Sequence, residues 1–73
     1  MNRYHINIFW SAEDECYVAD IPDLFPCSGF GATPAAALAE VLVAQELWLE
    51  TGQELGKPVP EPAYRPGSER LAG

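Results

Sequence analysis

The stretch from residue 29 to residue 34 most constrains how this chain can fold, because it turns an extended segment into a long helix. Thr33 is a good N-cap, since its hydroxyl can accept a hydrogen bond from an N–H group of the first turn. Pro34 suits the first helical position, where a missing N–H costs nothing. Gly31 allows a close backbone approach just before the cap. The junction predicts an α+β fold in which the strands before it and an extended segment after it cover the helix.

The segments before this junction predict a three-stranded antiparallel meander. Residues 4–10 alternate between apolar and polar side chains, as a half-buried strand does. Residues 11–15 form a polar turn, and residues 16–21 form the second strand. Residues 22–26 hold two prolines and predict a loop. Residues 27–32 predict a short third strand that is weakened by glycines.

The register of the first two strands decides which side chains face the helix. If Trp10 lies opposite Cys16, then Phe9 and Tyr17 meet on the face away from the helix. A slip of one residue exchanges the two faces. In either register, the face away from the helix keeps at least one large aromatic side chain, which another polypeptide surface has to shield from water.

The helix is expected to run from Pro34 to about Leu55, with Gly56 as a left-handed C-terminal cap. An apolar stripe at helical spacing marks its buried side: Leu38, Val41, Leu42, Trp48 and Leu49. Acids occupy the opposite side: Glu46, Glu50 and Glu54. Val43 and Leu47 fall among these acids and together indicate a second contact surface.

The proline-rich segment from residue 57 to residue 63 has two interpretations. Its prolines stand at every second position, so in a strand all of them would face one edge and block it against further pairing. This favours a C-terminal edge strand, and a solvated polyproline-type segment is the alternative. Residues 1–64 are therefore expected to form one domain, and residues 65–73 a flexible tail.

Size and charge indicate a chain that binds other proteins. A domain of 73 residues buries a limited share of its surface, which favours a homo-oligomer or a bound partner. The net charge of −7 argues against direct binding to nucleic acid and is compatible with a basic protein partner. No apolar run is long enough to span a membrane, and no signal peptide is visible, so we expect a cytoplasmic protein whose two cysteines stay reduced.

Chemically reactive side chains form no recognised catalytic pattern. One histidine and two cysteines at no known zinc spacing give no metal motif. The densest acidic group comprises Glu13, Asp14, Glu15, Asp20 and Asp23. These carboxylates could hold Mg²⁺ in a nuclease, but three of them lie in a turn, where acids are expected simply because the turn is wet. We therefore expect a protein that is not an enzyme and has no cofactor.

The combined pattern resembles the HicB-like antitoxin family over roughly residues 3–64. The resemblance rests on the strand 4–10, the acidic turn, residues 17–24, Cys27, Gly31, Thr33-Pro34, Ala37, Leu38, Trp48-Leu49 and residues 56–62. Phe25-Pro26 and Ala35-Ala36 depart from the family pattern. The family implies a partial ribonuclease-H-like fold with the element order β-β-β-α-β. The resemblance also implies that its members are not nucleases.

The resemblance also implies a function. Such proteins neutralise HicA, a small basic RNA-cleaving toxin, by covering its active surface. On this basis we expect an antitoxin-like homo-oligomer that binds a HicA-type toxin. The alternative is an oligomeric module without a toxin partner, of regulatory or unknown role. The expected contact residues, for a partner or for the oligomer, are Phe9, Glu13, Asp14, Tyr17, Asp23, Leu24 and Phe25.

Overall fold

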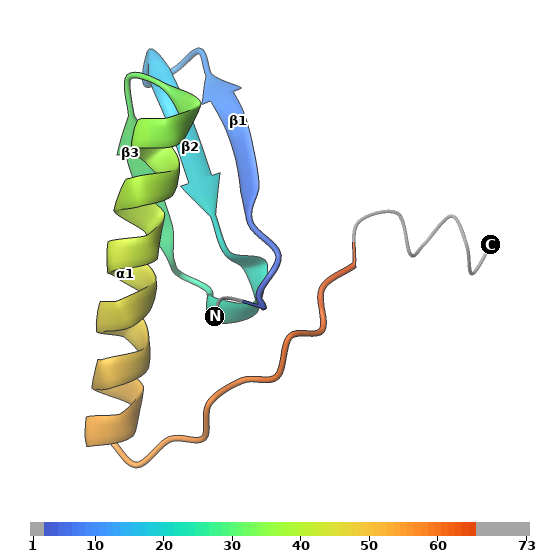
Figure 1. Ribbon diagram of the computed structural model, residues 1–73, viewed down its shortest axis with the longest axis vertical. Helices are drawn as coiled ribbons and strands as arrows, with labels where there is room; N and C mark the ends of the chain where they lie inside the picture. Colours follow the sequence, from blue (N-terminus) through green and yellow to red (C-terminus); the bar gives the residue numbers. More distant parts are fainter. Residues whose placement is uncertain (1–2, 66–73) are drawn as a thin grey trace, which may run out of the picture.

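The computed structural model describes residues 3–65, and within them a three-stranded antiparallel sheet is followed by a long helix (Figure 1). The strands occur in the order β1-β2-β3, so the predicted meander and the α+β class are confirmed. The elements are β1 (Asn7–Ser11), β2 (Cys16–Asp20), the short 3₁₀ helix η1 (Pro22–Leu24), β3 (Ser28–Gly31) and α1 (Pro34–Glu54).

The register differs by one residue from the pairing of Trp10 with Cys16 considered above. Trp10 lies opposite Tyr17, and Phe9 lies opposite Val18. Directly opposed residues share a sheet face, so Tyr17 lies on the helix side with Trp10, and their rings meet edge to face at 5.1 Å. The placement of Tyr17 on the outer face was therefore wrong. Alternation within one strand cannot reveal its offset from the next strand.

The helix packs directly on the backbone of β3. An ideal Cβ added to Gly29 would lie 2.3 Å from the backbone nitrogen of Val41, and one added to Gly31 would lie 2.5 Å from that of Ala37. Both distances are far below van der Waals contact, so only glycine fits at these two positions. The close approach explains why α1 lies over β2 and β3 and leaves the helix side of β1 partly open.

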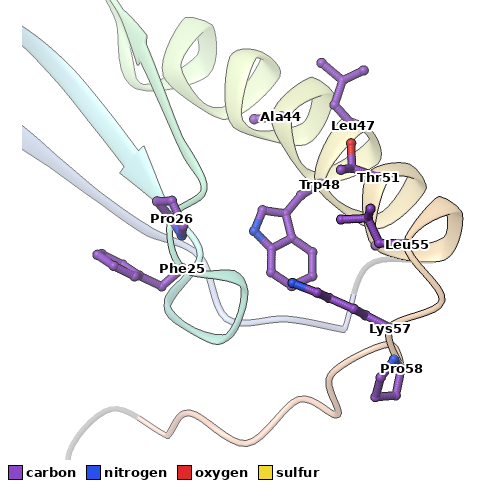
Figure 2. A pocket seen from close by; sticks show the side chains of 10 residues that line it. Phe25, Pro26, Ala44, Leu47, Trp48, Thr51, Leu55, Lys57 and Pro58 are labelled. Atoms are coloured by element: carbon purple, nitrogen blue, oxygen red, sulfur yellow. The ribbon is translucent and has the colours of Figure 1, made fainter.

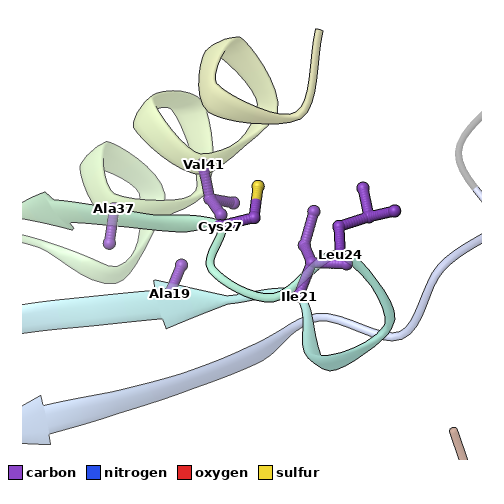
Figure 3. Packing of buried hydrophobic residues seen from close by; sticks show 6 residues of the cluster. All are labelled: Ala19, Ile21, Leu24, Cys27, Ala37 and Val41. Carbon is purple, nitrogen blue, oxygen red and sulfur yellow. The ribbon is translucent and has the colours of Figure 1, made fainter. Parts of the chain in front are cut away.

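The core is built mainly from small side chains, as expected where a helix approaches a sheet so closely. Its members are Ala19, Ile21, Leu24, Cys27, Ala37 and Val41 (Figure 3). Ile21 and Leu24 extend this core beyond the end of the sheet, because the turn after β2 folds back under the helix. The N–H of Ile21 donates to the carbonyl of Cys27 at 3.0 Å and closes that turn.

Both ends of α1 form as the sequence predicts. The Thr33 hydroxyl accepts from the N–H of Ala36 at 3.1 Å. Gly56 has a φ of 72°. Its N–H donates to the carbonyl of Gln53 at 3.0 Å, and that of Lys57 donates to the carbonyl of Gly52 at 2.8 Å. This pair of bonds is the Schellman arrangement, which ends a helix through a left-handed residue.

Residues 57–65 form no strand, so the predicted C-terminal edge strand is wrong within the residues that the structure describes. Prolines 58, 60 and 62 remove alternate donors, and no sheet hydrogen bonds form here. The segment is instead held by side chains: the Tyr4 hydroxyl donates to the carbonyl of Pro60, and the rings of His5 and Tyr64 lie 4.9 Å apart. Apart from Arg65, the tail expected at residues 65–73 lies outside the described residues.

Candidate functional site

An open apolar groove lies between the loop after η1 and the C-terminal half of α1 (Figure 2). Its volume is about 700 Å³. The loop contributes Phe25 and Pro26, and the segment after the helix contributes Lys57 and Pro58. The helix contributes Ala44, Leu47, Trp48, Thr51 and Gly52, and its C-cap residue Leu55 completes the lining. The groove thus joins segments that lie up to 33 positions apart (58 − 25).

The groove exists because the helix is longer than the sheet beneath it. A helix of 21 residues is about 31 Å long, whereas a strand of five residues is about 17 Å long. The C-terminal half of α1 therefore projects past the strands, and only turns and terminal segments approach it (Figure 1). Trp48 fills part of this space and points from α1 toward the loop (Figure 2).

Large apolar side chains are exposed along this groove. Phe25 is 84% exposed, and Leu47, on the rim, is 59% exposed. Leu55 at the end of the helix is exposed as well. Exposed hydrophobic groups are ordinary when scattered, but a contiguous set with a concave shape is typical of a binding surface.

Carboxylates lie on the solvent side of α1, beyond the Leu47 edge of the groove. Glu46, Glu50 and Glu54 are exposed and four residues apart, so they form one ridge along the helix. Lys57 is the cation among the groove-lining residues. The helix surface beyond the Leu47 edge is therefore negative, whereas the groove lining itself carries a cation.

A second apolar surface lies on the outer face of the sheet, the face away from α1. Phe9, Val18 and Phe30 are directly opposed in the register and form one row across all three strands. Phe9 is 50% exposed and Phe30 is 54% exposed, while Val18 between them is buried. The expectation that this face keeps a large aromatic side chain is confirmed.

The predicted contact residues do not form one site. Glu13 and Asp14 lie exposed in the turn between β1 and β2, where the Ser11 hydroxyl donates to a carboxylate oxygen of Asp14 at 2.9 Å. Asp23 and Phe25 lie beyond the other end of the sheet, about 17 Å away by strand length. A partner that contacts both the turn acids and the loop residues has to extend along the full length of a strand.

Two of the predicted contact residues are structural. Leu24 is fully buried in the core, so it cannot contact a partner, whereas its neighbour Phe25 is exposed. The carboxylate of Asp23 accepts hydrogen bonds from the N–H groups of Ala63 and Tyr64 at 3.2 Å. Asp23 thus fastens the C-terminal segment. Phe25 is the predicted residue that lines the groove.

The reactive side chains of the described residues form no metal-binding cluster. Among residues 3–65, no group of three or more His, Cys, Asp or Glu side chains is placed to hold a metal ion. Cys16 and Cys27 are free thiols. Burial raises the pKa of the Cys27 thiol, and the nearby Asp20 carboxylate raises it further, so this sulfur is held in its unreactive protonated form.

The sequence indicated two of the residues that line the groove, but it did not predict the groove itself. Leu47 was noted among the acids, and Phe25 was assigned to a contact surface. The missing signal was the difference in length between the helix and the strands, which leaves half the helix without a sheet below it.

Comparison with curated proteins identifies one similar sequence, the UPF0150 protein ssl0259 of Synechocystis sp.. It is 39% identical over 58 residues, which cover 80% of this chain and 78% of the relative. No family model matches the chain, and no solved structure matches it. Over the described residues, no helix combines the length and apolar character that crossing a bilayer requires.

Proposed function

This chain belongs to the UPF0150 family, and from that premise we propose that it is an antitoxin-like binding protein that covers the active surface of a small basic RNA-cleaving protein of the HicA type. The proposal joins the resemblance to HicB-like antitoxins, including their partial ribonuclease-H-like fold, with the surfaces described above. The observation that carries it is an apolar groove, with carboxylates along its Leu47 edge, on a chain of net charge −7.

Electrostatics support a basic protein as the partner. Opposite net charges accelerate encounter and disfavour wrong partners. Apolar groups then supply most of the affinity once water has left the interface. A protein that has to capture a basic ribonuclease before it reaches RNA needs both properties. Binding in the cytoplasm as a homo-oligomer is part of the proposal.

Co-expression tests this function directly. The chain is expressed together with a HicA-type toxin encoded beside its gene, and growth of the host is followed. We expect restored growth and a complex that copurifies and weakens as salt concentration rises. Unchanged toxicity at equal expression, with no complex at low salt, would contradict the proposal.

An alternative is an oligomeric module of regulatory role without a toxin partner. The apolar row Phe9, Val18 and Phe30 on the outer sheet face favours it, since self-association alone could cover this row. The alternative predicts a stable oligomer and no effect on any HicA-type toxin. Mg²⁺-dependent RNA cleavage by the purified protein, lost in Asp20→Asn, would instead indicate an enzyme.

A further inference from the structure

We propose that the groove between Phe25 and the C-terminal half of α1 is the docking site for the basic partner, and that its occupant is an apolar segment flanked by lysine or arginine. This assignment rests on the proposed function and deepens it. Of the contact residues predicted from the sequence, it keeps Phe25 of the loop and leaves out the turn acids and the outer aromatic residues.

The shape of the groove suits a short segment of a folded partner. The lining positions on this side run from Ala44 to the C-cap residue Leu55, and eleven helical steps span about 16 Å. That length accommodates about three turns of a partner helix laid along α1, which is the usual way in which an amphipathic helix enters an apolar groove. Trp48 provides the large aromatic surface that such interfaces use as an anchor, and Phe25, whose ring points away from Trp48, lies at the edge of the groove (Figure 2).

The charges around the groove specify the chemistry of the occupant. Leu47 forms one edge of the groove, and Glu50 and Glu54 lie three and seven residues farther along α1, next to this edge. A segment with apolar residues toward Trp48 and cations at the Leu47 edge satisfies both surfaces at once. An acidic or neutral segment would leave the carboxylates facing an uncharged or like-charged neighbour.

A second copy of this chain is a poorer occupant. It also carries a net charge of −7, so docking it beside the glutamate ridge brings like charges together. The outer sheet face suits self-association better. Its central row is Phe9, Val18 and Phe30, and the next row across the strands is Asn7, Asp20 and Ser28, which has one carboxylate.

The test uses a matched pair of exposed helix positions. Leu47 lines the groove, whereas Val43, one turn earlier and 56% exposed, does not. Because both side chains are largely in water, Leu47→Asp and Val43→Asp should both fold, which circular dichroism verifies. Binding of a catalytically inactive HicA-type toxin is measured by calorimetry at fixed salt. We expect Leu47→Asp to raise the Kd at least tenfold and Val43→Asp to leave it within about threefold.

Fluorescence supplies a second readout of the same site. In a Trp10→Phe background, Trp48 is the remaining tryptophan, so its emission reports on the groove. We expect the inactive toxin to shift this emission toward the blue, and Phe25→Ser to reduce the affinity measured in this way. The double variant Glu50→Gln/Glu54→Gln should flatten the dependence of Kd on salt.

The outcomes separate failure of the docking site from failure of the function. If the wild-type chain binds the toxin but Leu47→Asp binds it equally well and the Trp48 emission does not change, the groove assignment is wrong and the proposed function stands. If the wild-type chain binds no HicA-type toxin, both proposals fall.

Discussion

The backbone N–H of Tyr64 donates to both carboxylate oxygens of Asp23, at 3.2 Å each, and so joins positions 41 residues apart. The neighbouring N–H of Ala63 donates to the same carboxylate at 3.2 Å. The Asp23 carboxylate gives the backbone N–H groups of the C-terminal segment an acceptor, as strand pairing in a sheet would have done. The segment is therefore ordered without becoming a strand.

Removing the Asp23 carboxylate should release the C-terminal segment. We expect Asp23→Ala to lower the free energy of unfolding by about 1 kcal/mol, since the hydrogen bonds are charge-assisted but exposed to solvent. Amide hydrogen exchange at Ala63 and Tyr64 should accelerate, while exchange in β2 stays unchanged. Asp14→Ala, in the turn at the other end of the sheet, is the control. Unchanged exchange at Ala63 and Tyr64 would show that other contacts hold the segment.

The two glycines of β3 should tolerate no side chain. Gly29→Ala places a Cβ 2.3 Å from the Val41 nitrogen, and Gly31→Ala places one 2.5 Å from the Ala37 nitrogen. Because both neighbours are backbone atoms, the helix has to move, and we expect each variant to lose at least about 2 kcal/mol of stability in urea denaturation.

Gly52→Ala is the matched control for these substitutions. A Cβ at Gly52 meets nothing within 4 Å, and the residue lies inside α1. Alanine is the better helix former, so this variant should gain up to about 1 kcal/mol. A loss of stability in Gly52→Ala similar to that in Gly29→Ala would show that crowding at β3 is not the cause.

The local signals in the sequence were sufficient for the helix but not for the register of the sheet. Thr33, Pro34 and Gly56 act on hydrogen bonds within a few residues, so the ends of α1 follow from the sequence alone. The offset between β1 and β2 depends on how Trp10 and Tyr17 pack across strands, which alternation does not encode.

The candidate site was predictable only in part, for a related reason. Exposure of Phe25 and burial of Leu24 follow from the way the turn after β2 folds under α1, and no periodicity exists in so short a loop. The groove depends on the relative lengths of two elements and on the path of residues 57–58. Such long-range geometry has no signature in either segment by itself.

Stability should fall in alkaline solution. Burial raises the pKa of the Tyr4 hydroxyl above its ordinary 10.0, with further contributions from Asp23 and Glu61, and burial also raises the pKa of Cys27 above 9.0. The native state keeps both protons more tightly than the unfolded state. Their contribution is complete below the ordinary pKa values and is lost as pH rises through the native ones.

Urea denaturation at increasing pH measures this loss. We expect the free energy of unfolding to decline from about pH 9 upward in the wild type. Tyr4→Phe should flatten the decline above the ordinary tyrosine pKa, and Cys27→Ala should flatten its first part. Because Tyr4→Phe also removes a hydrogen bond to the Pro60 carbonyl, the slope against pH is the diagnostic quantity rather than the absolute stability. Identical slopes in all three proteins would contradict the assignment.

The buried side-chain oxygen of Gln45 should lower the free energy of unfolding. Its side-chain oxygen is buried and has no hydrogen-bond partner among the residues that the structure describes. We expect Gln45→Met, which keeps the length of the side chain and removes the unsatisfied oxygen, to raise the free energy of unfolding by about 1 kcal/mol. Gln53→Met, at an exposed position of the same helix, is the control and should change stability little. A destabilised Gln45→Met would imply that the oxygen has a partner in solution.

A charge on the outer sheet face should dissociate the proposed homo-oligomer. Phe30 lies in one row with Val18 and Phe9, and its ring is half in water, so Phe30→Lys can fold while it places a cation in this apolar row. Sedimentation equilibrium should show the wild type associated and Phe30→Lys monomeric at the same concentration. Leu47→Lys carries the same charge change on the groove rim, and if self-association uses the sheet face alone, this variant keeps the wild-type mass. If Leu47→Lys dissociates while Phe30→Lys stays associated, self-association uses the groove and not the sheet face.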